Sequence, residues 1–176
     1  MTDHYAVIGN PVAHSKSPQI HRAFAHQTSQ DIDYKHLFCE IGAFAATVTA
    51  FRDAGGSGLN VTLPFKHEAS ALATQRSARA ELAGAVNTLS FDGTAIAGDN
   101  TDGAGLTRDL TANLGVALSG KSILLLGAGG ASFGVVGPLL AAAPGALVIA
   151  NRTVSKAAAL VQRFAAYAGA SRFAAS

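Results

Sequence analysis

Ser122-Ile123-Leu124-Leu125-Leu126-Gly127-Ala128-Gly129-Gly130-Ala131 is the stretch that decides the fold of this chain. Its first five residues form a continuous apolar run, which is typical of a strand buried in a parallel sheet. The glycines predict a tight turn, and residues 133–142 predict a helix. A second apolar strand is expected at residues 147–150, so the order strand, turn, helix, strand predicts α/β architecture.

The glycine turn has the context of a dinucleotide-binding site, because it follows a strand and precedes a helix. Gly127 would permit the turn, and Gly129 would let backbone amides approach a pyrophosphate at the positive end of the helix. Ser132 takes the sixth position of the pattern, where glycine or alanine is usual. A purely structural turn is the alternative. The cofactor contacts expected here are Gly127, Ala128, Gly129, Gly130 and Ala131.

The next strand ends at Asn151-Arg152-Thr153, where a cofactor without a 2′-phosphate usually meets a carboxylate. Arginine instead offers a planar fork of donors that suits a phosphate dianion. Together with Asn151, Thr153 and Lys156, Arg152 therefore favours NADP over NAD. The alternative is a surface turn with a solvated arginine.

A second informative stretch, Asn60-Val61-Thr62-Leu63-Pro64-Phe65-Lys66, lies in the first half of the chain. Its small, β-branched and apolar residues predict the end of a strand, and Pro64 predicts a turn. A lysine just past that turn would lie at the rim of a sheet. An amine beside the neutral polar groups of Asn60 and Thr62 suits proton transfer to a small oxygenated molecule. As an isolated residue, Lys66 would more simply begin the next helix as a solvated charge.

Strands and helices alternate over the first hundred residues, which predicts a mainly parallel βαβ sheet. Ser17 is expected to cap a helix that has Pro18 at its first position and a buried stripe of Ile20, Ala23 and Phe24. Asp92-Gly93 predicts a hairpin. Strands are expected at residues 5–9, 33–39, 59–62, 86–91 and 94–97, and helices at 44–51, 67–83 (with a break near 76–77), 106–114 and 154–167. The domains expected are residues 1–101, a connector at 102–120, and an incomplete Rossmann-type domain at 121–176.

The composition is that of a globular protein, with 49% apolar and 14% charged residues. A net charge of +2 is too small to indicate nucleic acid or a membrane surface as a partner. The six histidines show no metal-ligand spacing, so no metal is expected. The lone Cys39, among apolar neighbours, fits a reducing cytoplasm, and neither a signal peptide nor a membrane span is expected.

Five motifs in a fixed order resemble the shikimate dehydrogenase family from residue 5 to about residue 165. Two are the stretches at Lys66 and Gly127, and the others are Ser15-Lys16-Ser17-Pro18, Ala85-Val86-Asn87-Thr88 and Gly98-Asp99-Asn100-Thr101-Asp102-Gly103. The resemblance implies the NADP-dependent, reversible reduction of 3-dehydroshikimate to shikimate, in the pathway to aromatic amino acids. It also implies that Asn151-Arg152-Thr153 clamps the 2′-phosphate.

The resemblance further implies a role for each residue of the substrate site. Lys66 would donate and accept the proton, assisted by Asp102, which also binds a substrate hydroxyl. Ser15 and Ser17 would hold the substrate carboxylate, and Thr62 and Asn87 the remaining ring hydroxyls. Without the resemblance, Asp102 could simply cap the following helix, and Asn87 could pass as a strand-end residue.

Two further alternatives remain at this point. A relative that also accepts quinate would differ in one substrate hydroxyl. A catalytically inactive ligand-binding fragment is the second alternative. Family members continue well beyond residue 176, so the chain is expected to be truncated. Its second sheet is then expected to have only two strands. A monomer or a homodimer is expected.

Overall fold

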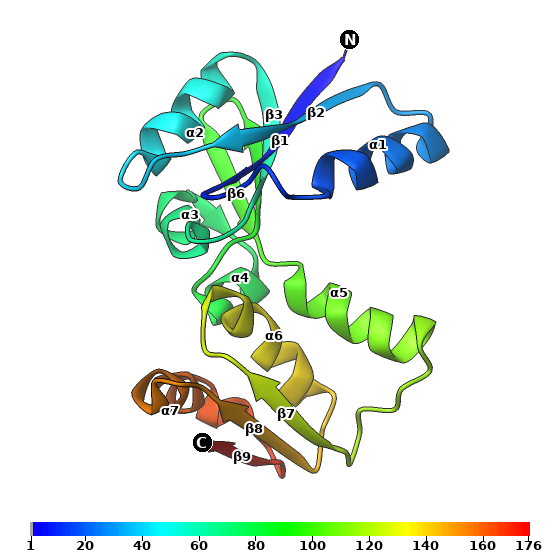
Figure 1. Cartoon of the computed structure of the whole chain (residues 1–176), viewed down its shortest axis with the longest axis vertical. Helices are drawn as coiled ribbons and strands as arrows, with labels where there is room; N and C mark the ends of the chain where they lie inside the picture. The colour runs from blue at the N-terminus through cyan, green and yellow to red at the C-terminus, as the bar shows by residue number, and fades with distance from the viewer. Residues whose placement is uncertain (1) are drawn as a thin grey trace. The chain divides into compact units, whose positions relative to one another are not determined.

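The computed structural model describes residues 2–176, which separate into two α/β units (Figure 1). The first unit ends at Asn100, and the second runs from Thr101 to Ser176. The first contains strands β1 (Asp3–Gly9), β2 (Ile32–Phe38), β3 (Gly56–Val61), β4 (Gln75–Arg76), β5 (Thr88–Asp92) and β6 (Ala95–Asp99). Its helices are α1 (Ser17–Thr28), α2 (Phe44–Asp53), α3 (Lys66–Leu72) and α4 (Ala78–Ala83).

The sheet of the first unit is mixed, with the strand order β2-β1-β3-β5-β6-β4. Strand β1 pairs in parallel with both β2 and β3, and β4 is parallel to β6. The hairpin strand β5 runs antiparallel to both of its neighbours, β3 and β6. The hairpin predicted around Asp92-Gly93 is thus confirmed, and Gly93 has the positive φ of 56° that such a turn favours.

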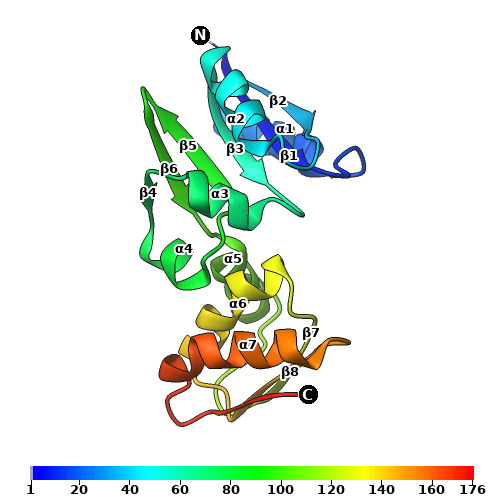
Figure 2. The same ribbon diagram turned by 90° about the vertical axis from the view of Figure 1, so that its left-hand side faces the viewer.

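Helices pack on both faces of this sheet, and Figure 1 shows α1 and α2 on opposite sides of β1. The main core lies between the sheet and helices α2 to α4 (Figure 2), and it includes the stacked rings of Phe44 and Phe65. On the other face, Val7 and Tyr34 form a smaller cluster beside α1. Alternation along β1 explains this division, since Ala6 and Ile8 face the main core and Val7 faces the smaller cluster.

The second unit begins with α5 (Asp102–Arg108), which continues as a π-helical segment (Asp109–Asn113). A parallel three-stranded sheet follows, in the order β7 (Ser122–Leu126), β8 (Ala146–Ala150) and β9 (Arg172–Ala175). Helices α6 (Gly130–Ala141) and α7 (Val154–Phe164) cover one face of this sheet (Figure 2), and a short 3₁₀ turn (Ala165–Tyr167) follows α7. Leu147 and Ile149 of β8 are fully buried, which confirms a Rossmann-like layering.

Two predictions about the second unit were wrong. Its sheet has three strands, because residues 172–175 pair in parallel with β8 through their backbones. Strand β7 is parallel as predicted but not buried, since Leu124 and Leu126 are 62% and 75% exposed.

Three predictions about the first unit also need correction. The buried stripe of α1 is not Ile20, Ala23 and Phe24, which are exposed, because the helix turns Pro18 and His21 toward the sheet. Ser17 is the first helical residue, after Lys16 at the N-cap, and no side chain caps the helix. The break expected near residues 76–77 of the helix 67–83 is confirmed, but it is wider than expected, since α3 ends at Leu72 and the strand β4 pairs with β6 before α4 begins.

Candidate active site

Three chain segments that carry predicted substrate residues meet at one edge of the first sheet. Strands β1 and β3 are parallel and end side by side, with Ile8 opposite Val61. Strand β5 begins at the same edge because it runs antiparallel to β3, with Asn60 opposite Thr88. The Val61 N–H donates to the Asn87 carbonyl over 2.7 Å, which joins the end of β3 to the residue before β5. Ligands commonly bind at this position in α/β sheets, beyond the carboxyl ends of parallel strands.

Thr62 and Lys66 are held by backbone hydrogen bonds around the turn at Pro64. The Thr62 N–H donates to Ile8, and its carbonyl accepts from Phe65 over 3.1 Å. Lys66, half-buried, is the first residue of α3, and its carbonyl accepts from the Val86 N–H over 2.8 Å. The start of α3 is therefore fixed against the segment that carries Asn87, so the structure brings Thr62, Lys66 and Asn87 together.

Ser15 and Ser17 form a small hydroxyl pair in the loop between β1 and α1. The Ser15 Oγ donates to the Ser17 Oγ over 3.1 Å and accepts from the Ser17 N–H over 3.3 Å. His36 Nε2 lies 2.9 Å from the Ser15 carbonyl, and since a carbonyl only accepts, this nitrogen carries the proton. The loop is thus tied to strand β2, and its two hydroxyls are adjacent, as a carboxylate seat requires.

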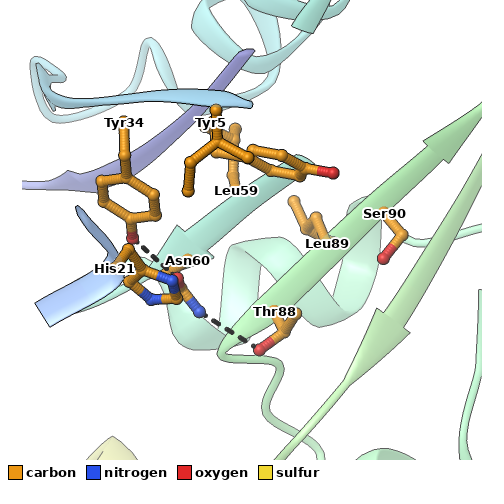
Figure 3. Close-up of a pocket in the computed structure, with 9 residues that line it drawn as sticks. Tyr5, His21, Tyr34, Leu59, Asn60, Thr88, Leu89 and Ser90 are labelled. Carbon is orange, nitrogen blue, oxygen red and sulfur yellow. Dashed lines mark hydrogen bonds between the residues drawn. The ribbon is translucent and has the colours of Figure 1, made fainter. Parts of the chain in front are cut away.

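Three polar side chains are joined by hydrogen bonds next to Asn87, and one of them, Tyr34, was missed by sequence reasoning. The Tyr34 hydroxyl donates to Asn60 Oδ1 over 2.6 Å, and Asn60 Nδ2 donates to Thr88 Oγ1 over 3.4 Å (Figure 3). These residues line a pocket of about 210 Å³ together with Tyr5 and His21. Tyr34 belongs to none of the motifs, and only the strand register brings it to Asn60.

Two further polar residues, the last residue of β6 and the one that follows it, support the same edge. The buried Asn100 donates from Nδ2 to the Ala85 carbonyl over 2.9 Å, which holds the segment before Asn87. Asp99 accepts from Arg79 Nε over 2.7 Å, from Ser77 Oγ over 2.5 Å and from the Asn100 N–H over 2.7 Å. The hydrogen bond from Arg79 is the main cause that lowers the pKa of Asp99 to about 2.

In the second unit, the glycine turn has the geometry predicted for it. Gly127 has a φ of 108°, a conformation that glycine adopts without strain. The buried Ser132 donates to the Gly127 carbonyl over 2.8 Å, so the hydroxyl at the sixth pattern position fastens the turn to α6. A Cβ on Gly127 or Gly129 would meet no atom within 4 Å, so the turn is open on its outer side and suits a phosphate group.

The second cofactor motif, after β8, is joined to this turn by Asn151. Its Oδ1 accepts from the Ala128 N–H over 3.2 Å, and its Nδ2 donates to the Thr153 carbonyl over 2.8 Å. Arg152, Thr153 and Lys156 are exposed around the start of α7, with the Lys156 N–H donating to the Thr153 carbonyl. The donor set there is cationic and accessible, which fits a phosphate.

Asp102 is the first residue of α5 and belongs to the second unit, whereas Lys66 belongs to the first.

Between residues 2 and 176, no group of three or more histidine, cysteine or acidic side chains is arranged to hold a metal ion. No helix in that range is long and apolar enough to cross a membrane.

Two family models match the chain. Residues 7–89 match the shikimate dehydrogenase substrate-binding domain. Residues 109–174 match shikimate/quinate 5-dehydrogenase. The serine pair, Thr62, Lys66 and Asn87 all fall within the first match, and the glycine turn and Arg152 within the second.

Individual relatives agree with these matches. The NADP-dependent shikimate dehydrogenase of Dechloromonas aromatica is 60% identical over 165 residues, which are 94% of this chain and 60% of that protein. Shikimate 5-dehydrogenase from Thermus thermophilus, solved with NADP(H) and shikimate, has a TM-score of 0.86 at 34% identity over 97% of this chain and 62% of its own. The Listeria monocytogenes enzyme, solved with shikimate and NAD, has a TM-score of 0.87 at 27% identity, covering 99% and 61%. The chain therefore spans about 60% of the length of these relatives.

Proposed function

The chain belongs to the shikimate dehydrogenase family, and from that premise we propose that it carries out the NADP-dependent, reversible reduction of 3-dehydroshikimate to shikimate. The observation that carries this proposal is the single sheet edge at which Ser15, Ser17, Thr62, Lys66 and Asn87 gather. A carboxylate seat, hydroxyl partners and an amine are the groups that a cyclic hydroxy acid with one ketone requires.

Each group has a distinct task in the proposed reaction. The two adjacent serine hydroxyls donate to the substrate carboxylate, and Thr62 and Asn87 hydrogen-bond to ring hydroxyls. In the reducing direction the ketone oxygen takes up a proton, and the Lys66 ammonium supplies it. In the oxidising direction the same amine accepts the hydroxyl proton. We assign Asp102 as the second catalytic residue on the strength of the family motif.

The cofactor residues of the second unit are proposed to be Gly127 to Ala131 for the pyrophosphate, and Asn151, Arg152, Thr153 and Lys156 for the 2′-phosphate. NADPH, when bound, supplies the hydride. The protein orients it: the open turn at Gly127 and Gly129 and the start of α6 favour the pyrophosphate, and Arg152 favours the extra phosphate of NADP over NAD.

Two alternatives from the sequence remain candidates. A shikimate dehydrogenase that also accepts quinate would use the same carboxylate seat, and the second family model includes both activities. A ligand-binding protein without turnover would still use the substrate-binding residues of the first unit. The buried thiol of Cys39 supports a cytoplasmic location, and a monomer or homodimer is proposed.

Isothermal titration calorimetry of the purified chain with shikimate and with quinate tests the proposal. Shikimate is expected to bind, and Ser15→Ala with Ser17→Ala to abolish measurable binding. Gln19→Ala, on the exposed part of α1, is the matched control and retains wild-type affinity. NADPH binding, followed by its fluorescence, tests the second unit separately. Equal affinity for quinate supports the broader alternative, and absence of shikimate binding contradicts the proposed function.

A further inference from the structure

We propose that Ser132 and Asn151 are positioning residues that together fix the peptide group between Gly127 and Ala128 for binding of the cofactor pyrophosphate. The inference rests on the proposed function and deepens it. Ser132 is outside the residues proposed to contact the cofactor, and Asn151 gains a task besides the 2′-phosphate. As a consequence, both residues matter for NADH as well as for NADPH, because both cofactors carry the pyrophosphate.

The peptide group between Gly127 and Ala128 is held at both of its polar ends by side chains. Its carbonyl oxygen, on Gly127, accepts from the Ser132 Oγ over 2.8 Å. Its N–H, on Ala128, donates to the Asn151 Oδ1 over 3.2 Å. A peptide group is planar, so two hydrogen bonds at its opposite ends determine how the plane is rotated. Ser132 and Asn151 therefore act on one rigid unit.

This restraint is needed because Gly127 does not fix the plane by itself. Its φ of 108° is open to glycine, but glycine also adopts many other backbone conformations at little cost. A Cβ on Gly127 would meet no atom within 4 Å, so no neighbour packs against that side of the residue. The side chains of Ser132 and Asn151 supply the selection of one conformation that the glycine lacks.

Both side chains are anchored by the structure around them. Ser132 is 7% exposed and lies in the first turn of α6. Asn151 directly follows β8, and the Gly127 N–H donates to the Ala150 carbonyl over 2.8 Å, which keeps the end of β8 beside the turn. The Asn151 Nδ2 donates to the Thr153 carbonyl, so the other end of its amide is held as well. The turn is thus ordered before a cofactor binds, and a preordered site loses less conformational entropy on binding.

Ser132→Ala and Asn151→Ala each release one end of the peptide group. Each variant should weaken NADPH and NADH binding, followed by nucleotide fluorescence, roughly two- to tenfold, the effect of one hydrogen bond. The double variant releases both ends and should weaken the binding of both cofactors further. The matched controls are Ser122→Ala, at the exposed start of β7, and Asn113→Ala, in the π-helical segment. Both controls should bind the two cofactors as the wild type does.

Binding of NADH gives the decisive comparison. A residue that only contacts the 2′-phosphate would affect NADPH and leave NADH unchanged, since NADH lacks that phosphate. NADH affinity equal to that of the wild type in the double variant overturns the inference and leaves the proposed function standing. Thermal melting of each variant establishes that the cofactors are added to folded protein.

Hydrogen exchange of the Ala128 backbone amide, measured by NMR without ligand, tests the coupling within the peptide group. Exchange should be faster in Ser132→Ala than in the wild type, although the Ser132 hydroxyl bonds to the carbonyl end. It should also be faster in Asn151→Ala, and Asn151→Asp, which keeps an acceptor oxygen, should restore the slow exchange. The amides of β8 are the internal reference, because a general loss of stability would accelerate their exchange too.

The proposed function and this inference fail in different ways. A wild-type chain that binds neither NADPH nor NADH contradicts the proposed use of the cofactor. Unchanged exchange of the Ala128 amide in Ser132→Ala overturns the inference, whether or not the chain binds a cofactor.

Discussion

Gly9 lies against Thr62 so closely that a Cβ atom on Gly9 would stand 2.5 Å from the Thr62 Cγ2. The same atom would stand 3.2 Å from the Leu63 carbonyl oxygen. The end of β1 and the turn before Lys66 thus share a space that only glycine leaves open. Absence of a side chain at Gly9 is what permits the site edge to close.

We therefore expect Gly9→Ala to displace the Thr62 turn and to weaken shikimate binding more than tenfold, since an overpacked contact typically costs about 1–3 kcal/mol. NADPH binding by the second unit should be unaffected. Calorimetry for shikimate and fluorescence for NADPH measure the two affinities. Gly105→Ala, in α5, is the control, because a Cβ there would meet no atom within 4 Å. Normal shikimate affinity in Gly9→Ala would show that the turn adapts without cost.

Arg152→Asp should reverse the cofactor preference. A carboxylate repels the 2′-phosphate of NADP and accepts a hydrogen bond from the ribose hydroxyl of NAD. The ratio of the dissociation constants for NADPH and NADH, measured by fluorescence, should shift by at least about tenfold, the equivalent of one lost charged contact. Arg163→Asp changes the charge equally at the far end of α7 and is the control. The Listeria monocytogenes relative was solved with NAD. An unchanged ratio would show that Arg152 is a surface turn residue without a role in the choice between NADPH and NADH.

Asp99 should make the first unit sensitive to acid. Its pKa in the folded chain, about 2, lies below the ordinary value of 3.8, chiefly because of the hydrogen bond from Arg79. Its stabilising contribution is therefore complete above pH 4 and is lost as the pH falls toward 2. Urea unfolding at pH 5 and pH 2.5 should show a smaller loss of stability for Asp99→Asn and for Arg79→Met than for the wild type. Arg22→Met, which removes an exposed guanidinium from α1, controls for net charge. If Asp99→Asn loses as much stability between pH 5 and pH 2.5 as the wild type, the Asp99 carboxylate is not the cause of the acid sensitivity.

Local patterns along the sequence predicted most strands, the hairpin at Asp92-Gly93 and the turn at Gly127, because each depends on neighbouring residues. The face of α1 was not predictable in the same way. Two adjacent stripes on that helix can both face a sheet, and the stacking of His21 on Tyr34 selects one of them. Strand β9 was missed because its four residues are too short a run to show a strand pattern by themselves, and the strand depends on pairing with β8.

The candidate site likewise contains residues that local sequence predicts and residues that only the three-dimensional fold places. Lys66 and the serine pair are recognisable from their own neighbours in the chain. Tyr34 is not, since it is placed beside Asn60 only by the register of strands far apart in sequence. Asn100 likewise acts on Ala85, 15 residues away, from inside the core. Supporting residues of this kind become visible only in three dimensions.

The most direct test of the central claim, that Lys66 transfers the proton in a shikimate dehydrogenase, is the rate of NADPH oxidation with 3-dehydroshikimate. The assay uses this chain continued with the C-terminal part of the Dechloromonas aromatica relative, of which the present sequence covers 60%. Lys66→Ala should lower kcat by roughly two to four orders of magnitude, the usual contribution of a general acid. Shikimate affinity should change far less, and Lys16→Ala, a lysine between the two serines, should keep kcat within about threefold, as expected for an exposed residue. Turnover of Lys66→Ala at the wild-type rate would contradict the account.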